Sequence, residues 1–220
     1  MEQLFHLALE LIKNISNPDY VYQLIKEYNT VFYAVFFIII FTETGLVVMP
    51  LLPGDSLLFL AGAAIAATGA LKLEVTIPLL ILAALLGDNV NYFVGLFFGE
   101  QIKKRERILF FKREYLDQTH TYYEKHGGKT VIMARFIPIV RTIAPFVAGA
   151  GSMSYGRYII FCITGAILWV GGVTMLGYEF GGIDIVKHNF EKVILGIVFL
   201  SVMPMLWQFI KPRLTAKPKA

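Results

Sequence analysis

Five ionisable residues lie within otherwise apolar stretches of this 220-residue chain: Glu43, Asp55, Asp88, Arg135 and Arg141. A charge at the centre of a membrane-spanning helix is unfavourable by about 2.5–3.5 kcal/mol, unless acids and bases pair or the acids bind protons. The planar guanidinium groups of Arg135 and Arg141 present paired N–H donors that suit a phosphate. These residue types predict an anion-binding, proton-coupled site inside a membrane. In it the arginines hold the anion, and Glu43 and Asp55 exchange protons.

Proline and glycine residues next to these charges predict interrupted helices around the site. Pro53 and Gly54 precede Asp55, a favourable helix-capping residue, so a short helix is expected to start there. Thr142, between two prolines, is expected to cap a counterpart helix. Helix N-termini that point at a midplane cavity favour anions. The predicted supporting residues are Pro53, Gly54, Ser56, Asp88, Pro138, Thr142, Pro145 and Gly149.

A purely structural role of the charges is the main alternative. Glu43 or Asp55 would then only neutralise an arginine and lock two segments together. Asp88, beside Asn89 and Asn91, is expected to bridge helices through hydrogen bonds. Enzyme activity is not expected, because the four histidines lie outside the apolar stretches and the single cysteine has no base beside it. No metal or other cofactor is expected.

The composition is typical of a membrane protein. Apolar residues make up 56% of the chain and charged residues 16%, against roughly 25% charged residues in soluble domains. Four stretches of low charge, each about long enough to cross a bilayer, are expected to be spans: residues 28–42, 75–99, 158–178 and 193–210. The first of them would cross only if its helix continued past Glu43.

Two further apolar segments, about residues 44–71 and 130–156, are too short to cross the bilayer twice, and prolines interrupt both. They are expected to be re-entrant hairpins. The predicted fold is an all-α integral membrane protein: a multi-span helical bundle with two oppositely oriented re-entrant hairpins, forming an inverted repeat, and amphipathic surface helices.

Lysine and arginine are unevenly distributed along the chain. Residues 100–129 carry eight of the twenty, and the tail 211–220 carries four, so both segments and both termini are expected on the cytoplasmic side. The basic run that starts at Lys103 lies beside a span, which favours contact with anionic lipid over nucleic acid. Residues 1–27 are expected to form an amphipathic helix, and residues 100–129 an amphipathic segment with a helix from Phe111 to Lys125. Residues 28–210 would form one transmembrane domain.

A short internal repeat supports the two opposed hairpins. Phe59-Leu-Ala-Gly-Ala63 in the first matches Phe146-Val-Ala-Gly-Ala150 in the second. Each match is followed by a span with two glycines four residues apart, Gly95 with Gly99 and Gly177 with Gly181. Because the predicted topology gives the two units opposite senses, the pattern indicates the inverted repeats of secondary transporters.

Several motifs in this order resemble the DedA family, the bacterial branch of the SNARE-associated, or VTT-domain, membrane proteins. They are Glu43 followed by Leu52-Pro53-Gly54-Asp55-Ser56, Gly87-Asp88 before Tyr92, and Arg135-Phe-Ile-Pro138-Ile-Val-Arg141 before Pro145 and Ala148-Gly149. The resemblance covers about residues 28–210. It implies two opposed re-entrant hairpins, an acidic pair at Glu43 and Asp55, and an arginine pair at Arg135 and Arg141.

The resemblance also implies a bacterial inner-membrane protein that moves phospholipids or polyprenyl phosphates, undecaprenyl phosphate above all, between leaflets with the proton motive force. The leading hypothesis is therefore a flippase-like lipid transporter whose partners are membrane lipids and protons. Association into a homo-oligomer stays open. The alternatives are a proton-coupled exporter of small ions or drugs, and a membrane scaffold that transports nothing.

Overall fold

The computed structural model describes residues 2–15, 17–46, 54–105, 107–108, 111–112, 129–136, 138–151, 153–181, 183, 186, 192–193 and 196. These residues are helical apart from short connections and one antiparallel pair of two-residue strands. The predicted span 193–210, the basic tail 211–220 and residues 113–128 of the predicted amphipathic segment lie almost wholly outside the described residues.

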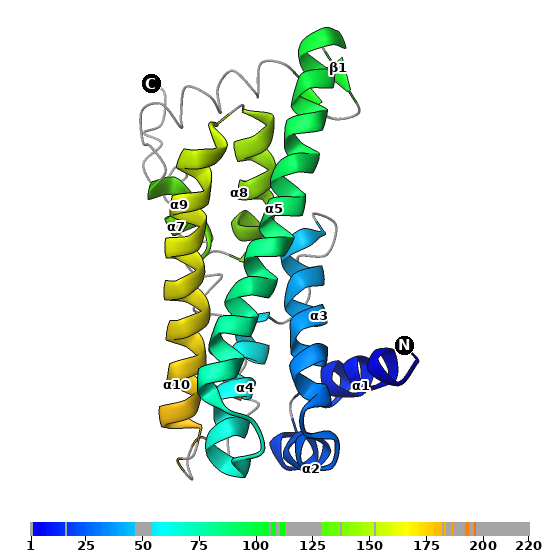
Figure 1. Cartoon of the computed structure of the whole chain (residues 1–220), viewed down its shortest axis with the longest axis vertical. Coiled ribbons are helices and arrows are strands. Elements are labelled where there is room, and N and C mark those ends of the chain that lie inside the picture. The colour runs from blue at the N-terminus through cyan, green and yellow to red at the C-terminus, as the bar shows by residue number, and fades with distance from the viewer. Residues whose placement is uncertain are drawn as a thin grey trace, which may run out of the picture.

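The helices of the first half of the chain are α1 (Glu2–Lys13), α2 (Pro18–Tyr28), α3 (Val31–Gly45), α4 (Gly54–Thr68) and α5 (Leu73–Arg105). The strands are β1 (Arg107–Ile108) and β2 (Phe111–Lys112). They are followed by α7 (Lys129–Ala134), α8 (Pro138–Ala150), α9 (Tyr155–Ala166), the π-helical turn η1 (Ile167–Gly171) and α10 (Gly172–Phe180). Figure 1 shows α5 along the full height of the bundle, with α9 and α10 beside it.

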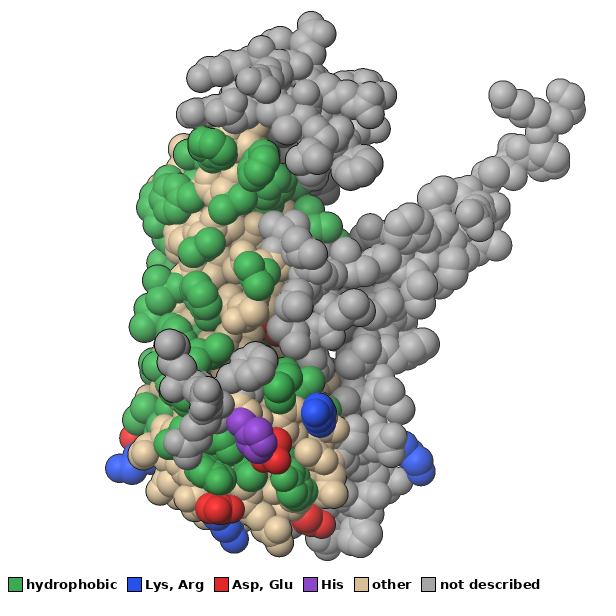
Figure 2. Space-filling model, turned by 90° about the vertical axis from the view of Figure 1, so that its right-hand side faces the viewer, with side chains coloured by type: hydrophobic (Ala, Val, Ile, Leu, Met, Phe, Trp, Pro, Cys, Tyr) green, Lys and Arg blue, Asp and Glu red, His purple; other side chains and the backbone are tan. Residues whose placement is uncertain are grey.

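Two helices of the described part are long and apolar enough to cross a membrane, Leu73–Gly99 and Tyr155–Phe180. Their 27 and 26 residues correspond to about 40 Å at 1.5 Å per residue, more than the ~30 Å of bilayer hydrocarbon. Both predicted spans at these positions agree with the structure. Large apolar side chains such as Leu86, Phe93 and Phe97 remain exposed along α5. On the coloured surface of Figure 2, hydrophobic side chains are spread over the region above the lower end, and the charged ones gather at that end.

The helices α3, α4 and α8 have 15, 15 and 13 residues, about 20–22 Å each, and are too short to cross by themselves. The helix at the predicted span 28–42 is therefore too short to cross the membrane by itself. It continues past Glu43 for only two residues, since α3 ends at Gly45. In Figure 1, α4 and α8 both start near the middle of the bundle and run to opposite ends.

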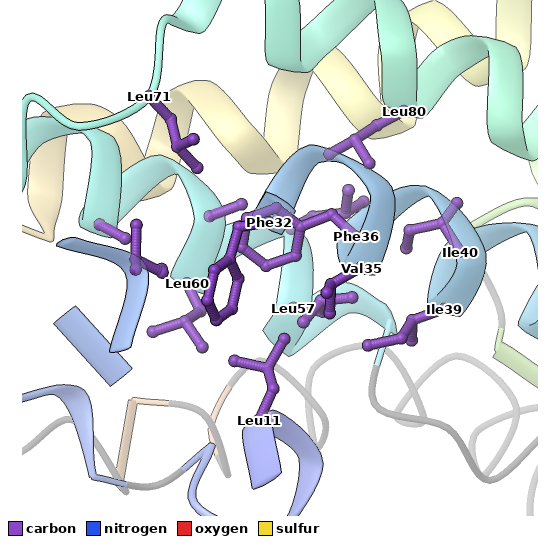
Figure 3. Packing of buried hydrophobic residues seen from close by; sticks show 14 of the residues in the cluster. Leu11, Phe32, Val35, Phe36, Ile39, Ile40, Leu57, Leu60, Leu71 and Leu80 are labelled. Atoms are coloured by element: carbon purple, nitrogen blue, oxygen red, sulfur yellow. The ribbon is translucent and has the colours of Figure 1, made fainter. Parts of the chain in front are cut away.

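The N-terminal segment contains two amphipathic helices rather than the single one expected. They are separated at Asn17, whose side chain accepts a hydrogen bond from the Tyr20 backbone N–H at 3.2 Å and so caps α2. Their apolar residues Leu7, Leu11 and Ile25 are buried in the main hydrophobic cluster. Figure 3 shows Leu11 directed at Phe32 and Leu57. This apolar face is therefore covered by the protein.

The expectations for residues 100–129 need correction where the structure describes them. Helix α5 continues without a break to Arg105, because its charged end contains good helix formers. Phe111 and Lys112, expected to start a helix, form β2, which pairs Ile108 with Phe111. Both paired residues are apolar and favour strands, which explains the short ladder.

Glycine residues bring α4 against α10 and α5 against α8 in the same way. A Cβ on Gly177 of α10 would collide with the Phe59 carbonyl group of α4, and one on Gly62 would collide with the Thr174 carbonyl oxygen of α10. In the other pair, a Cβ on Gly95 would collide with the Phe146 carbonyl group, and one on Gly149 would collide with the Tyr92 carbonyl oxygen. Gly181 and Gly99 continue the two contacts against Ala63 and Ala150. Each repeat motif thus packs on the span of the other half.

We expect Gly95→Ala to lower the stability of the protein by about 1–3 kcal/mol, because the new methyl group must push two helix backbones apart. Thermal unfolding in detergent, followed by circular dichroism, measures the effect. Gly156→Ala is the matched control, since its Cβ would meet no atom within 4 Å. Equal melting temperatures for the two variants would contradict this close helix contact.

Candidate anion-binding site

Arg141 joins three helix ends that are distant in the sequence. Its Nη2 donates to Glu43 Oε1 at 2.5 Å, and its Nη1 donates to Asp55 Oδ1 at 2.7 Å. Glu43 lies in the last turn of α3, Asp55 in the first turn of α4 and Arg141 in the first turns of α8. Arg141 is 4% exposed and Glu43 0%. With both acids ionised, this group carries one excess negative charge.

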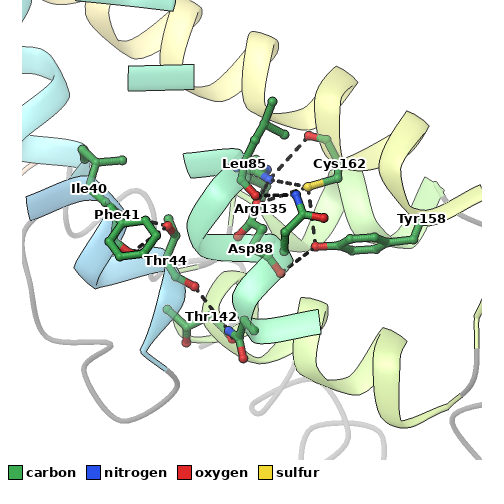
Figure 4. Close-up of polar contacts among 11 residues, drawn as sticks. Ile40, Phe41, Thr44, Leu85, Asp88, Arg135, Thr142, Tyr158 and Cys162 are labelled. Atoms are coloured by element: carbon green, nitrogen blue, oxygen red, sulfur yellow. Dashed lines mark hydrogen bonds and ion pairs between the residues drawn. The ribbon is translucent and has the colours of Figure 1, made fainter. Parts of the chain in front are cut away.

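Local sequence features make room for this arrangement. Gly54 lies against the Glu43 carboxylate, where any side chain would collide with it. Asn91 of α5 donates to the backbone oxygens of Thr142 at 2.6 Å and of Thr44 at 3.3 Å, and so ties α8 to the end of α3. Figure 4 shows this link between the three helices. The amide therefore fixes the positions of the elements that carry Arg141 and Glu43.

Arg135 belongs to a second polar group, whose acid Asp88 lies on α5. Its Nη2 donates to Asp88 Oδ2 and contacts Cys162 Sγ at 3.3 Å. Tyr158 donates its hydroxyl to the Asp88 backbone oxygen at 3.0 Å, and the Cys162 thiol lies 3.3 Å from Asp88 Oδ2. All four side chains are buried. Figure 4 shows how they lie together.

Trp169 lies between the two groups. Its indole Nε1 donates to Asp55 Oδ1 at 2.6 Å. Its ring centroid is 4.3 Å from Cζ of Arg141 and 5.9 Å from Cζ of Arg135, which are cation–π distances. The two arginines thus share one aromatic neighbour.

Several buried polar atoms of the two groups have no hydrogen-bond partner among the described residues. They are Arg141 Nε, Arg135 Nη1, Glu43 Oε2 and Asp88 Oδ1. An unpaired polar atom is unfavourable in a buried place, and such exceptions cluster where a ligand or water binds. Within the part of the chain that the structure describes, both arginines therefore retain a donor without a partner, which an anion can satisfy.

The structure brings together the four residues predicted from the sequence, but it pairs them differently. Glu43 and Asp55 both bind Arg141, whereas Arg135 binds Asp88. Asp88 bridges α5 to α9 through hydrogen bonds, as expected, and it is in addition the counter-charge of Arg135. Asn91 provides a further bridge between helices.

The supporting residues also differ in part from expectation. Thr142 lies inside α8 and does not cap it, because Pro138 already starts that helix. Pro145 does not interrupt α8, although its missing N–H leaves the Arg141 carbonyl without its usual helical partner. Ser56 is buried, and its Oγ is without a partner in the described part. Gly149 packs on α5, and Pro53 lies outside the described residues.

Asn91 was expected in the cluster that bridges helices, but sequence reasoning missed Trp169, Cys162 and Tyr158. Each lies in a long apolar helix, where its type alone does not distinguish packing from polar contact. The one available signal is spacing, since Tyr158 and Cys162 are four residues apart and share a helix face. Among the described residues, no group of three or more His, Cys, Asp or Glu side chains could hold a metal ion.

Comparison with known proteins shows the family. The model of the VTT domain matches residues 52–179, which include most of the site. The chain belongs to the DedA family. It is 49% identical to the protein DedA of Escherichia coli over 195 residues, 88% of this chain and 89% of that protein. No solved structure matches the chain.

Two other relatives have names that describe membrane proteins. An uncharacterized membrane protein of Mycobacterium leprae is 47% identical over 169 residues, 77% of this chain and 75% of the relative. The inner membrane protein YqjA of Escherichia coli is 34% identical over 175 residues, 80% of this chain and 79% of that protein. Family membership and the two long apolar helices agree on a membrane protein.

Proposed function

We propose that this DedA-family protein moves a phosphate-bearing lipid, undecaprenyl phosphate or a related phospholipid, between the leaflets of the bacterial inner membrane. The location rests on the name of the relative YqjA. The observation that supports the lipid phosphate is the buried Arg141 fork, which two carboxylates hold beside an Nε donor that has no partner among the described residues. A guanidinium group that is buried and held in this way matches a phosphate with two donors at fixed spacing.

Protons provide the exchange step of the proposal. In the empty site, Glu43 and Asp55 accept hydrogen bonds from Arg141 and compensate its charge. When a carboxyl group binds a proton, it loses its charge and its strong attraction to Arg141, and the phosphate takes its place. Release of the proton on the other side returns the arginine to the acids. This scheme makes transport dependent on the proton motive force.

The packing supports an inverted repeat with two re-entrant units. Helices α4 and α8 start near the site and run to opposite ends of the bundle, and each packs on the span of the other half through equivalent glycines. Short helices that begin at a midplane site are a feature of secondary transporters. We propose that 44–71 and 130–156 are the re-entrant units and that both termini are cytoplasmic.

The test is transport by purified protein in proteoliposomes. Labelled undecaprenyl phosphate is the substrate, phosphatidylcholine is the comparison lipid, and two opposite pH gradients are imposed. We expect flipping of the polyprenyl phosphate that responds to the gradient and is lost in Arg141→Ala. Arg157→Ala is the matched control, because Arg157 is an exposed arginine at the start of α9.

The other outcomes separate the alternatives. If neither lipid moves but a small ion or cationic drug drives proton flux in the same vesicles, the protein is an exporter. If the protein moves neither lipid nor solute, the scaffold alternative is favoured and lipid transport is wrong.

A further inference from the structure

Trp169 occupies an unusual place in the second long helix. It lies in η1, the π-helical turn Ile167–Gly171 between α9 and α10, and is 1% exposed. A π-helical turn adds about one residue to a helix and so rotates the side chains after it by about 100°. Such turns frequently occur at functional sites. Trp169 thus lies within such a turn and contacts the site from there.

The indole makes two different contacts with the Arg141 group. Its N–H and the Arg141 Nη1 both donate to the same oxygen, Asp55 Oδ1, at 2.6 and 2.7 Å. Its ring face lies over the Arg141 guanidinium at 4.3 Å. Asp55 thus accepts one hydrogen bond from the anion-binding Arg141 and a second one from Trp169.

We propose that Trp169 is a positioning residue for a phosphate monoester at Arg141, an inference that rests on the proposed function. When the phosphate takes the Arg141 donors, Asp55 keeps the indole N–H and is not left as a buried carboxylate without any donor. The ring meanwhile holds the guanidinium plane in place. Because the same ring lies 5.9 Å from Arg135, it also keeps the second arginine beside the first.

Tryptophan fluorescence tests this inference directly. The chain contains two tryptophans, so Trp207→Phe leaves Trp169 as the single indole. The protein in nanodiscs is titrated with a short-chain prenyl phosphate and, as the matched control, with the prenol of the same length. We expect a saturable change in Trp169 emission with the phosphate and none with the alcohol. No change with the phosphate, in protein that transports normally, would overturn the inference and leave the proposed function standing.

Transport kinetics of Trp169→Phe provide the second test, in the otherwise native chain. Phenylalanine keeps an aromatic face for Arg141 but lacks the N–H that supports Asp55. We expect the half-saturating concentration of the phosphate lipid to rise about tenfold, with the maximal rate retained, since a hydrogen bond to a charged group is lost in the loaded site. Trp169→Leu, which also lacks the ring, is expected to lower the maximal rate as well.

A purely structural tryptophan gives a different pattern. Trp169→Phe would then reduce the amount of folded protein or the maximal rate without changing the half-saturating concentration, and this result would overturn the inference. Failure of the wild-type protein to move any phosphate lipid would overturn the proposed function instead. The two failures are therefore distinguishable.

Discussion

Arg141→Gln is expected to abolish lipid transport and to destabilise the protein by about 3–5 kcal/mol. The change leaves Glu43 and Asp55 buried without their shared counter-charge, and breaking a buried ion pair by removing one partner has an effect of this size. Transport is measured in proteoliposomes, and stability by thermal unfolding of the same preparation. The two losses together would not show what the arginine does for the substrate.

Arg141→Lys separates the two effects. Lysine keeps a positive charge between the acids, so we expect most of the stability to remain. It lacks the planar fork that matches a phosphate, and transport should still fall about a hundredfold or more, as two charge-assisted hydrogen bonds are lost or misplaced. Full transport by the lysine variant would show that Arg141 acts only as a charge and would contradict its role as the phosphate ligand.

Asp88→Asn is expected to have an equally large effect on stability. Arg135 is 4% exposed, and in this variant it has no remaining carboxylate among its hydrogen-bond partners in the described structure. A buried guanidinium without a counter-charge again predicts a loss of about 3–5 kcal/mol. Cys162→Ser serves as a comparison, because it changes a neighbour of the pair without removing a charge. A melting temperature for Asp88→Asn that equals that of the wild-type protein would contradict a structural ion pair.

Combining Asp88→Asn with Arg135→Gln tests what the pair does beyond holding the fold. The double variant has neither charge, so we expect it to recover much of the stability lost in Asp88→Asn. If Arg135 contributes to phosphate binding, the recovered protein should still fail to transport. Normal transport by the double variant would show that the pair has a structural role only. This is the structural alternative that the sequence left open for the buried charges.

The sequence was sufficient to predict which charges lie inside the membrane domain and where the two long spans run. Glu43, Asp55, Arg135 and Arg141 are recognisable because an ionisable residue in an apolar stretch is unfavourable without a partner. The spans at 75–99 and 158–178 could be predicted because each is an apolar stretch long enough to cross a bilayer as a helix. The repeated Phe59 and Phe146 motifs indicated an inverted repeat, but not that each motif packs on the long helix of the other half.

The pairing of the charges could not be predicted, because it depends on tertiary packing. Arg135 and Asp88 are 47 residues apart, and the sequence offers Glu43 and Asp55 as equally suitable partners. The same limit applies to Trp169, which resembles any other core aromatic in the sequence, although it donates to Asp55 in the structure. The end of α3 at Gly45 was also uncertain, since the apolar stretch continues beyond Glu43 in the sequence.

The long separation between Arg141 and its acids has a consequence for biosynthesis. Arg141 follows Asp55 by 86 residues and Glu43 by 98. At about 5–20 residues per second, the ribosome needs roughly 4–20 s to add the base after the acids have been made. Helix α4 is likewise made before α10, the helix on which its Gly62 packs. The insertion machinery therefore receives three acids before their arginines. Until the second half of the chain is made, bound protons or water must compensate the charge of these acids.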